Sequence, residues 1–212
     1  MSTVVAEGVI PVAAPAYGTG AFDPLVELHG VWTPDLADRY LPIPGMPPVK
    51  YECQDGHLIV SPYEGSANTY AAYRMLTLME PPARRMGCRA YPTLNVQLGV
   101  NRWIQPDFAV LDEPARGRVW IPAQRARLVG ECVSPSSRVA DRIDKPTMCA
   151  EAGIEYFMRV EVSYTKGHAE IVLLRLDEHG TYEVHTKALA GSTFTTQEPF
   201  PLSFDPAELL ED

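Results

Sequence analysis

Two short apolar segments constrain this chain more than any other feature, because each carries a single carboxylate. Residues 103–111 read WIQPDFAVL and contain Asp107, and residues 127–135 read RLVGECVSP and contain Glu131. Both segments have the composition of buried strands, where an isolated ionised carboxylate is costly. Two such carboxylates on neighbouring strands predict a cation between them or a cleft that is open to water.

The length and charge of the chain indicate an acidic protein with one large domain. The 212 residues fit a single domain better than two small ones, and the net charge of -9 argues against a surface uniformly adapted to nucleic acid. A local basic face stays open, because residues 84–127 hold eight arginines against three acidic residues. We expect residues 1–30 to form a loosely ordered lead-in, since they lack any period, and residues 31–212 to form the domain.

The cysteines and the apolar runs exclude several classes of protein. Four widely spaced cysteines form no C-x-x-C pair, so they predict reduced thiols rather than a zinc site or a disulfide framework. No apolar run approaches the roughly 18 residues that a membrane span requires, and the first residues lack the features of a signal peptide. The expected location is therefore the cytoplasm.

Local signals predict alternating helices and strands. The Thr-Pro pair at 33–34 is typical of a helix start, and the Asp-Gly pair at 55–56 predicts a tight hairpin turn between two strands. A helical pattern begins near Ser66, and we expect the Pro-Pro pair at 81–82 to stop it. A later helix is expected to end at Gly153.

The order of these elements predicts an α/β fold with a central mixed β-sheet flanked by helices. We expect the early hairpin and the strands of Asp107 and Glu131 to form the middle of that sheet, together with residues 154–162. With Glu52 and Lys145, these acids supply the parts that phosphodiester hydrolysis needs. Carboxylates hold a hard divalent ion, which activates water and neutralises charge on phosphorus, and a lysine stabilises the developing negative charge.

Five motifs occur in an order that is similar to a known family. They are YExxDG from Tyr51, PD at 106–107, ECVSPSS from Glu131, DxxxK ending at Lys145, and AGIEYF from Ala152. Together they resemble the Uma2 family of restriction-endonuclease-like proteins, a branch of the PD-(D/E)XK nuclease superfamily. The resemblance covers roughly residues 32–210.

The resemblance implies a restriction-endonuclease-like fold and an endonuclease that hydrolyses DNA with Mg²⁺ or Mn²⁺. It identifies Asp107 and Glu131 with the metal-binding acids of the superfamily, and Glu52 with the family's acid on the early hairpin. The backbone carbonyl of Cys132 is implied as a further metal ligand. A homodimer is expected by analogy, because cutting both strands of a duplex takes two sites.

The resemblance departs from the superfamily at the lysine. The usual lysine lies two residues after the second acid, where this chain has Val133, and the family's motif transfers its role to Lys145. Pro146 follows Lys145 directly, and a proline at this position affects whether the lysine side chain points toward the acids. In addition, Asn68 stands where many members have histidine.

Two questions stay open from the sequence. The arginines are either an ordinary solvated face or a surface that contacts DNA phosphates beside the metal site. The candidates for phosphate contact are Arg84, Arg85, Arg89 and Arg102. The alternative to an endonuclease is a catalytically degenerate nuclease-fold protein that acts as a nucleic-acid-binding or assembly module.

Overall fold

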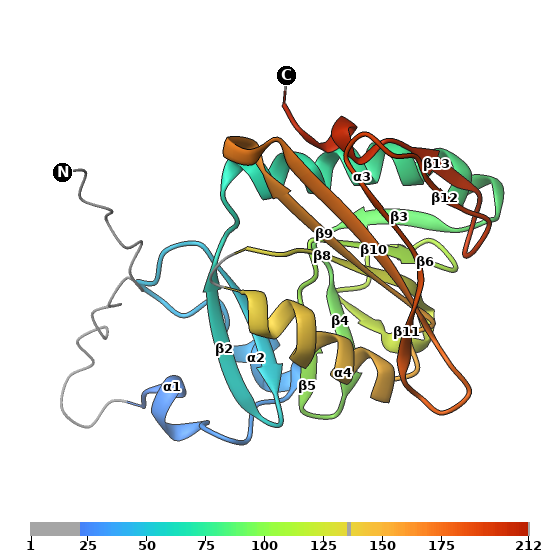
Figure 1. Ribbon diagram of the computed structural model, residues 1–212. Coiled ribbons are helices and arrows are strands. Elements are labelled where there is room, and N and C mark those ends of the chain that lie inside the picture. The colour runs from blue at the N-terminus through green and yellow to red at the C-terminus, as the bar shows by residue number, and fades with distance from the viewer. Residues whose placement is uncertain (1–21, 135–136, 212) are drawn as a thin grey trace, which may run out of the picture.

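The computed structural model describes residues 22–134 and 137–211, in which helices pack against two main β-sheets (Figure 1). The strands of the larger sheet, in spatial order, are β11 (Tyr182–Leu189), β10 (His168–Leu176), β9 (Tyr156–Ser163), β8 (Ala126–Cys132), β6 (Phe108–Leu111) and β3 (Arg89–Pro92). This sheet is mixed, because β8 and β9 run parallel while its other neighbouring strands are antiparallel.

The smaller sheet has five strands and lies beside the larger one. In spatial order they are β2 (His57–Pro62), β1 (Val49–Gln54), β5 (Arg102–Ile104), β4 (Asn95–Gly99) and β7 (Trp120–Pro122). A separate antiparallel pair is formed by β12 (Phe194–Thr196) and β13 (Leu202–Phe204). The predicted α/β fold with a mixed sheet and flanking helices is therefore confirmed.

One detail of the predicted sheet is wrong. The hairpin of β1 and β2 belongs to the smaller sheet and not to the middle of the larger one. The reason is that residues 103–111 do not form one strand: β5 pairs with β1, whereas β6 pairs with β8. The chain crosses from one sheet to the other at residues 105–107, and Asp107 lies at this crossing.

The described residues form four α-helices. They are α1 (Pro24–Glu27), α2 (Pro34–Tyr40), α3 (Ser66–Arg85) and α4 (Lys145–Glu151). A π-helical turn (Ala140–Asp144) leads directly into α4, and 3₁₀ turns lie at Ala123–Arg125, Tyr164–Lys166 and Pro206–Leu209. In Figure 1, α3 crosses one face of the larger sheet and α4 lies on its other side.

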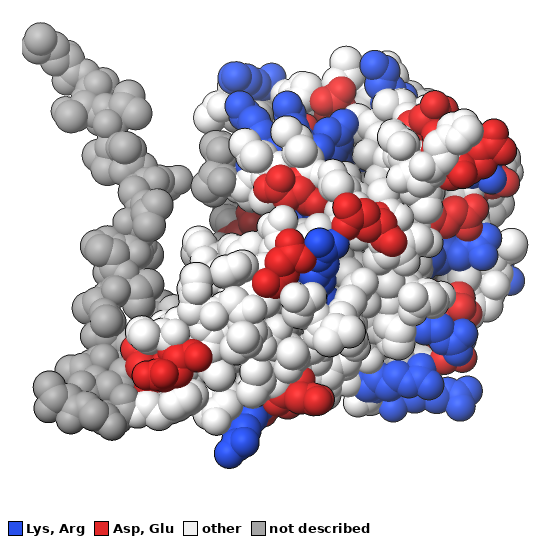
Figure 2. Space-filling model, turned by 90° about the horizontal axis from the view of Figure 1, so that it is seen from below, with Lys and Arg blue, Asp and Glu red and all other residues white. Residues whose placement is uncertain are grey.

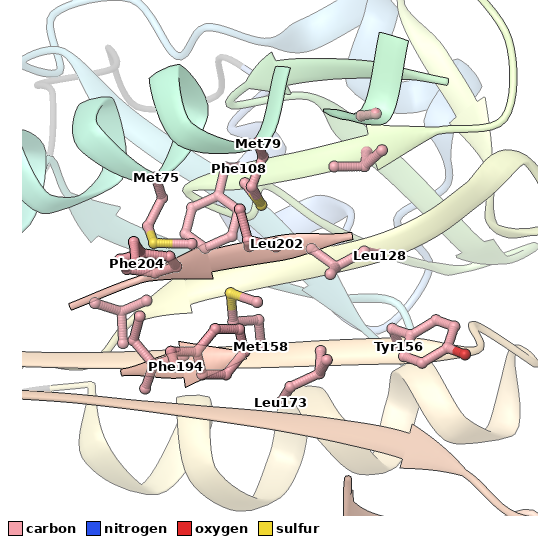
Figure 3. Packing of buried hydrophobic residues seen from close by; sticks show 14 of the residues in the cluster. Met75, Met79, Phe108, Leu128, Tyr156, Met158, Leu173, Phe194, Leu202 and Phe204 are labelled. Atoms are coloured by element: carbon pink, nitrogen blue, oxygen red, sulfur yellow. The ribbon is translucent and has the colours of Figure 1, made fainter. Parts of the chain in front are cut away.

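The larger sheet separates two apolar clusters. On the α3 side, Met75 lies beside Phe108, as Figure 3 shows, and Leu128 belongs to the same cluster. On the α4 side, Met148 packs with Val129. Leu128 and Val129 are consecutive in β8, so the alternation of a strand sends their side chains to opposite faces. Both faces of β8 are thus buried.

Two local predictions are confirmed. Helix α2 begins at Pro34, and the side chain of Thr33 caps it by accepting a backbone hydrogen bond from its first turn. The hairpin turns at Asp55 and Gly56, both of which have positive φ. Glycine is required at position 56, because a Cβ there would lie 2.3 Å from the carbonyl oxygen of Gly30.

Helix α3 continues past the proline pair that was predicted to stop it, so that prediction is wrong. Pro81 and Pro82 lie inside the helix, which ends at Arg85. Prolines remove backbone hydrogen bonds from a helix, but here they fall in its last turns, where Pro82 and Ala83 are buried. Burial against the sheet therefore outweighs the local preference.

The predicted lead-in is described only in part. Residues 1–21 lie outside the described residues, and residues 22–30 contain α1, which is capped by the side chain of Asp23. Among residues 22–134 and 137–211, no helix combines the length and the apolar character that crossing a membrane would need.

Candidate metal centre

The crossing between the two sheets places Asp107 beside Glu131. Phe108 pairs with Gly130 in the antiparallel register of β6 and β8, so the preceding Asp107 lies opposite Glu131. Glu131 is two residues from Val129 and shares its face, the one covered by α4. Both carboxylates are buried, with only 7% and 1% of Asp107 and Glu131 exposed.

Gly130 allows this close pairing of β6 with β8. A Cβ at that position would lie 1.9 Å from a ring carbon of Phe108. Any larger residue would push Phe108 away, and with it the start of β6. The glycine between Val129 and Glu131 therefore sets how closely the two acids approach.

Strand β1 contributes two charged residues to the same region. Tyr51 and Cys53 point into an apolar cluster of the smaller sheet, so the alternating residues Lys50 and Glu52 face the other way. Both are buried, and the Nζ of Lys50 lies 2.5 Å from Oδ1 of Asp107. The early hairpin thus supplies a lysine as well as the predicted acid.

Lys145 is the first residue of α4 and connects three acids. Its Nζ lies 3.0 Å from Oε1 of Glu131, 3.1 Å from Oε1 of Glu52 and 3.3 Å from Oδ1 of Asp141. The π-helical turn places Asp141 four residues earlier on the same side of the helix. Pro146 does not divert the side chain, because proline is tolerated in the first turn of a helix.

Hydrogen bonds from a backbone N–H and from a side-chain amide fix further oxygens of the site. The N–H of Cys132 donates to Oδ2 of Asp107 at 2.7 Å, so both oxygens of that carboxylate have partners. The carbonyl of Cys132 accepts a hydrogen bond of 2.8 Å from Nδ2 of Asn68, which also donates to Oε2 of Glu64 at 2.9 Å. The first turn of α3 is in this way tied to the end of β8.

We refer to these seven ionisable side chains as the charged cluster. Its members are Lys50, Glu52, Glu64, Asp107, Glu131, Asp141 and Lys145. Three of them were not predicted as site residues, namely Lys50, Glu64 and Asp141. The alternation of β1 could have identified Lys50, because it shares the face of Glu52, whereas no local signal marks Glu64.

Burial raises the pKa values of three acids in the charged cluster. It raises the pKa of Glu131 well above its usual range, and the nearby Lys145 offsets only part of that effect. Burial likewise raises the pKa of Asp141, again partly offset by Lys145, and that of Glu64. The negative charge of these groups is therefore incompletely compensated.

The two lysines of the charged cluster stay protonated. Burial alone would lower the pKa of Lys145, but the charges of Glu131, Glu52 and Asp141 outweigh it and raise the pKa above its usual value. The same balance holds for Lys50, whose pKa is raised by Asp107 and Glu131 against the effect of burial. Two positive charges thus face five carboxyl groups.

The donor chemistry fits a hard divalent cation. The candidate ligands are all oxygens, from the carboxylates of Asp107, Glu131 and Glu52 and the carbonyl of Cys132. In residues 22–134 and 137–211 the acids are directed at lysine ammonium groups, and no three His, Cys, Asp or Glu side chains are arranged as a metal-binding group. The buried Oδ1 of Asp141 also faces a lysine ammonium, that of Lys145, at 3.3 Å.

The predicted phosphate-binding arginines are not brought together with the acids. Arg84 and Arg85 end α3, about 24 Å along its axis from Asn68, because each helical residue advances the chain by 1.5 Å. Arg89 pairs with Leu111, at the opposite end of β6 from Asp107. On the face seen in Figure 2, basic side chains lie in several separate groups among acidic ones.

Arg102, the remaining candidate, is occupied by two carboxylates. Its guanidinium lies 2.5 Å from an oxygen of Asp55 and 2.5 Å from an oxygen of Glu151. These contacts tie the hairpin turn to the end of α4. Arg102 is therefore placed to join the two elements that carry Glu52 and Lys145.

A protein family and a solved structure each match most of the chain. The sequence matches the Uma2 family, described as "putative restriction endonuclease", over residues 37–208. It is similar in fold to a solved structure from Anabaena variabilis described as "a putative nuclease belonging to DUF820", with a TM-score of 0.54 and 14% identity over 81% of this chain and 95% of that one. A comparison with curated proteins gave no match. Because the family match extends over most of the sequence, the chain belongs to the Uma2 family.

Proposed function

We propose that this chain is a Mg²⁺-dependent endonuclease that hydrolyses phosphodiester bonds of DNA. One observation carries the proposal: two buried acids, Asp107 and Glu131, stand opposite each other on adjacent strands and each contacts a lysine ammonium. A buried ion pair is weak evidence of stabilisation, since a well-packed apolar pair would serve as well or better. The cost of burying these charges therefore favours a functional reason for them.

The residues that would hold the ion are Asp107 and Glu131, with Glu52 and the carbonyl of Cys132 as further oxygen ligands. When bound there, Mg²⁺ or Mn²⁺ would make a water more acidic and neutralise negative charge on the phosphate. The chain itself fixes the ligands: the N–H of Cys132 orients Asp107, and the N–H of Gln105 donates to Oε1 of Glu52 at 2.8 Å. The acids are thus preorganised by backbone groups.

The role of Lys145 in this proposal is to position the attacking water and to stabilise the charge that develops on phosphorus. Its ammonium already lies 3.0 Å from Glu131, so it stands next to a proposed ligand of the ion. Because it begins α4, its position depends on a helix whose Met148 and Cys149 are buried and not on a loop. That placement replaces the lysine that is absent at Val133.

DNA is the proposed substrate, and a homodimer is the proposed assembly for cutting both strands. Arg84 and Arg85 have no acidic partner within the described ranges, so they remain available to phosphates distant from the reacting one. Arg89 instead donates to the backbone carbonyl of Cys88 at 2.7 Å. Any contact of these arginines with DNA would add affinity rather than chemistry.

The test is cleavage of supercoiled plasmid and of short single- and double-stranded DNA by the purified chain. We expect nicking that requires Mg²⁺ or Mn²⁺, stops with EDTA and is lost in Asp107→Asn. The matched control is Asp112→Asn, because Asp112 follows the same strand at its other end and forms an exposed ion pair with Arg125. Cleavage by Asp107→Asn at the wild-type rate would contradict the proposed site.

A second candidate function is a nuclease-fold module that holds nucleic acid or assembles without cutting. One observation favours it: the ammonium of each lysine in the charged cluster is already engaged by carboxylates. A binding module would retain DNA in a filter or gel assay and show no Mg²⁺-dependent turnover. A pure assembly role would show neither metal nor DNA affinity.

A further inference from the structure

We infer that Lys50 is a second catalytic lysine of this site, which donates hydrogen bonds to a non-bridging oxygen of the phosphate that is cut. This inference rests on the proposed function, and it concerns a residue that was not predicted from the sequence. Lys50 lies on β1, is only 5% exposed, and places its Nζ 2.5 Å from Oδ1 of Asp107.

The two lysines differ in how many of their donors are used. A lysine ammonium has three N–H groups. Lys145 directs its ammonium at three carboxylates, those of Glu131, Glu52 and Asp141. Lys50 forms one ion pair within the described residues, with Asp107. Within the described residues, Lys50 therefore keeps more donors for a ligand than Lys145, whose ammonium faces three carboxylates before metal and substrate bind.

Lys50 is also held in place without the help of a ligand. Its strand is fixed on one side by the hairpin with β2 and on the other by β5. The neighbouring side chains Tyr51 and Cys53 anchor the opposite face of β1 in an apolar cluster. The ammonium thus meets the substrate from a rigid element, as a group that stabilises a transition state should.

The chemistry at this position follows from the charge of the substrate. Hydrolysis joins the oxygen of a water to phosphorus and breaks the bond to a sugar oxygen, which takes up a proton as the attacking water gives one up. Negative charge on the non-bridging oxygens is stabilised by a fixed ammonium in a dry site. Lys50 would supply that ammonium, and its contact with Asp107 places it beside a proposed metal ligand.

The test separates the loss of an ammonium from the loss of a metal site. In Lys50→Met we expect single-turnover cleavage to fall by about 10²-fold or more, since it removes one preorganised charge. Mn²⁺ affinity, measured by electron paramagnetic resonance without DNA, should be unchanged or higher, because a positive charge beside Asp107 is gone. The matched control is Lys187→Met, which replaces an exposed lysine on β11 and should leave both values unchanged.

Two further variants guard against misfolding. Lys50→Arg keeps the positive charge and should retain more cleavage than Lys50→Met. Lys50→Cys treated with 2-bromoethylamine regains an ammonium of nearly the original length, and we expect cleavage to return. Because position 50 is as buried as the four native cysteines, the reagent is applied to the unfolded chain in a background with those four replaced by alanine, and the chain is then refolded. The same background with Lys50 kept is the control.

Several results would overturn the inference. Cleavage by Lys50→Met within threefold of wild type would show that Lys50 does not contact the reacting phosphate. Parallel loss of cleavage and of Mn²⁺ affinity, with no recovery after alkylation, would assign Lys50 a structural role. If the wild-type chain itself cuts no DNA, the proposed function fails and the inference falls with it, a result distinct from the first two.

Discussion

The two ends of strands β6 and β8 carry the same kinds of charged residue in opposite settings. At one end, Asp107 and Glu131 are buried and contact lysines of β1 and α4. At the other end, Asp112 and Glu113 pair with Arg125 at 3.2 and 2.5 Å, with more than a third of each side chain exposed. Counting ion pairs would not distinguish these ends, whereas burial does.

The difference has a simple energetic basis. An exposed ion pair contributes about 0–1 kcal/mol, because water screens it and the side chains lose entropy. Removing one partner of a buried pair costs about 3–5 kcal/mol, because it leaves an uncompensated charge. We therefore expect the same substitution to have large effects at the site end and small ones at the arginine end.

The largest expected contrast is in activity. Glu131→Gln should lower DNA cleavage by roughly 10³-fold or more, since it removes a negatively charged ligand oxygen that the proposed mechanism requires. Glu113→Gln, at the exposed end, should leave the rate unchanged. Rates come from plasmid nicking at saturating Mg²⁺, with circular dichroism to confirm folding. Equal rates in the two variants would remove the functional distinction between the ends.

The next contrast is in stability. Lys145→Met should lower the free energy of unfolding by about 3–5 kcal/mol in EDTA, because three carboxylates lose their shared ammonium. Arg125→Met should cost less than about 1 kcal/mol, since its partners are in water. Urea denaturation of both variants measures this. A cost for Lys145→Met no larger than that for Arg125→Met would mean that the site carries no excess negative charge.

A smaller effect is expected in how the stabilisation of the fold by Mg²⁺ depends on pH. The raised pKa of Glu131 means that the metal-free folded chain binds more protons than the unfolded one, so its stability should fall as pH rises above the ordinary value of 4.5. Mg²⁺ competes with those protons, and its stabilisation should grow by up to about 1.4 kcal/mol per pH unit for each proton displaced.

Thermal unfolding with and without Mg²⁺, from pH 5 upward, measures this growth. Asp112→Asn should behave like the wild type, and Asp107→Asn should lose the Mg²⁺ effect. A Mg²⁺ stabilisation that is independent of pH would indicate that the ion binds away from Glu131.

The smallest effect is expected for the two arginines at the C-terminal end of α3. Replacing both Arg84 and Arg85 by alanine should leave the single-turnover rate unchanged, because these residues end α3 far from the acids. If they contact phosphates, DNA binding weakens and the slope of log affinity against log salt falls by up to about 2. Fluorescence anisotropy over a salt series measures the slope. A large loss of turnover would instead place these arginines at the reacting phosphate.

Some of the fold could be predicted because its signals are local. The hairpin at Asp55-Gly56 and the helix start at Thr33-Pro34 depend on turn and cap chemistry within a few residues. The break at residues 105–107 could not be predicted, because long-range contacts stabilise it. The side-chain oxygen of Gln105 accepts the N–H of Tyr51 at 2.9 Å, and this joins the crossing to the smaller sheet.

A residue of the site could be predicted where it is a charged residue among apolar neighbours in the sequence. Asp107 and Glu131 stand out because their neighbours are apolar, and the structure buries both. Lys50 and Glu64 lie in segments of mixed composition, where a charged residue normally faces water. The burial of Lys50 and the half-burial of Glu64 follow from the packing of the hairpin and α3 against the larger sheet, which local sequence does not specify.

The central claim is that the buried acids form a metal site. A crystal grown with Mn²⁺ and recorded at the manganese absorption edge tests it most directly. We predict an anomalous peak within bonding distance of oxygens of both Asp107 and Glu131, with the ammonium of Lys145 shifted from its present contact of 3.0 Å with Glu131. A saturated crystal with no peak between these carboxylates, and with both lysine contacts unchanged, would contradict the account.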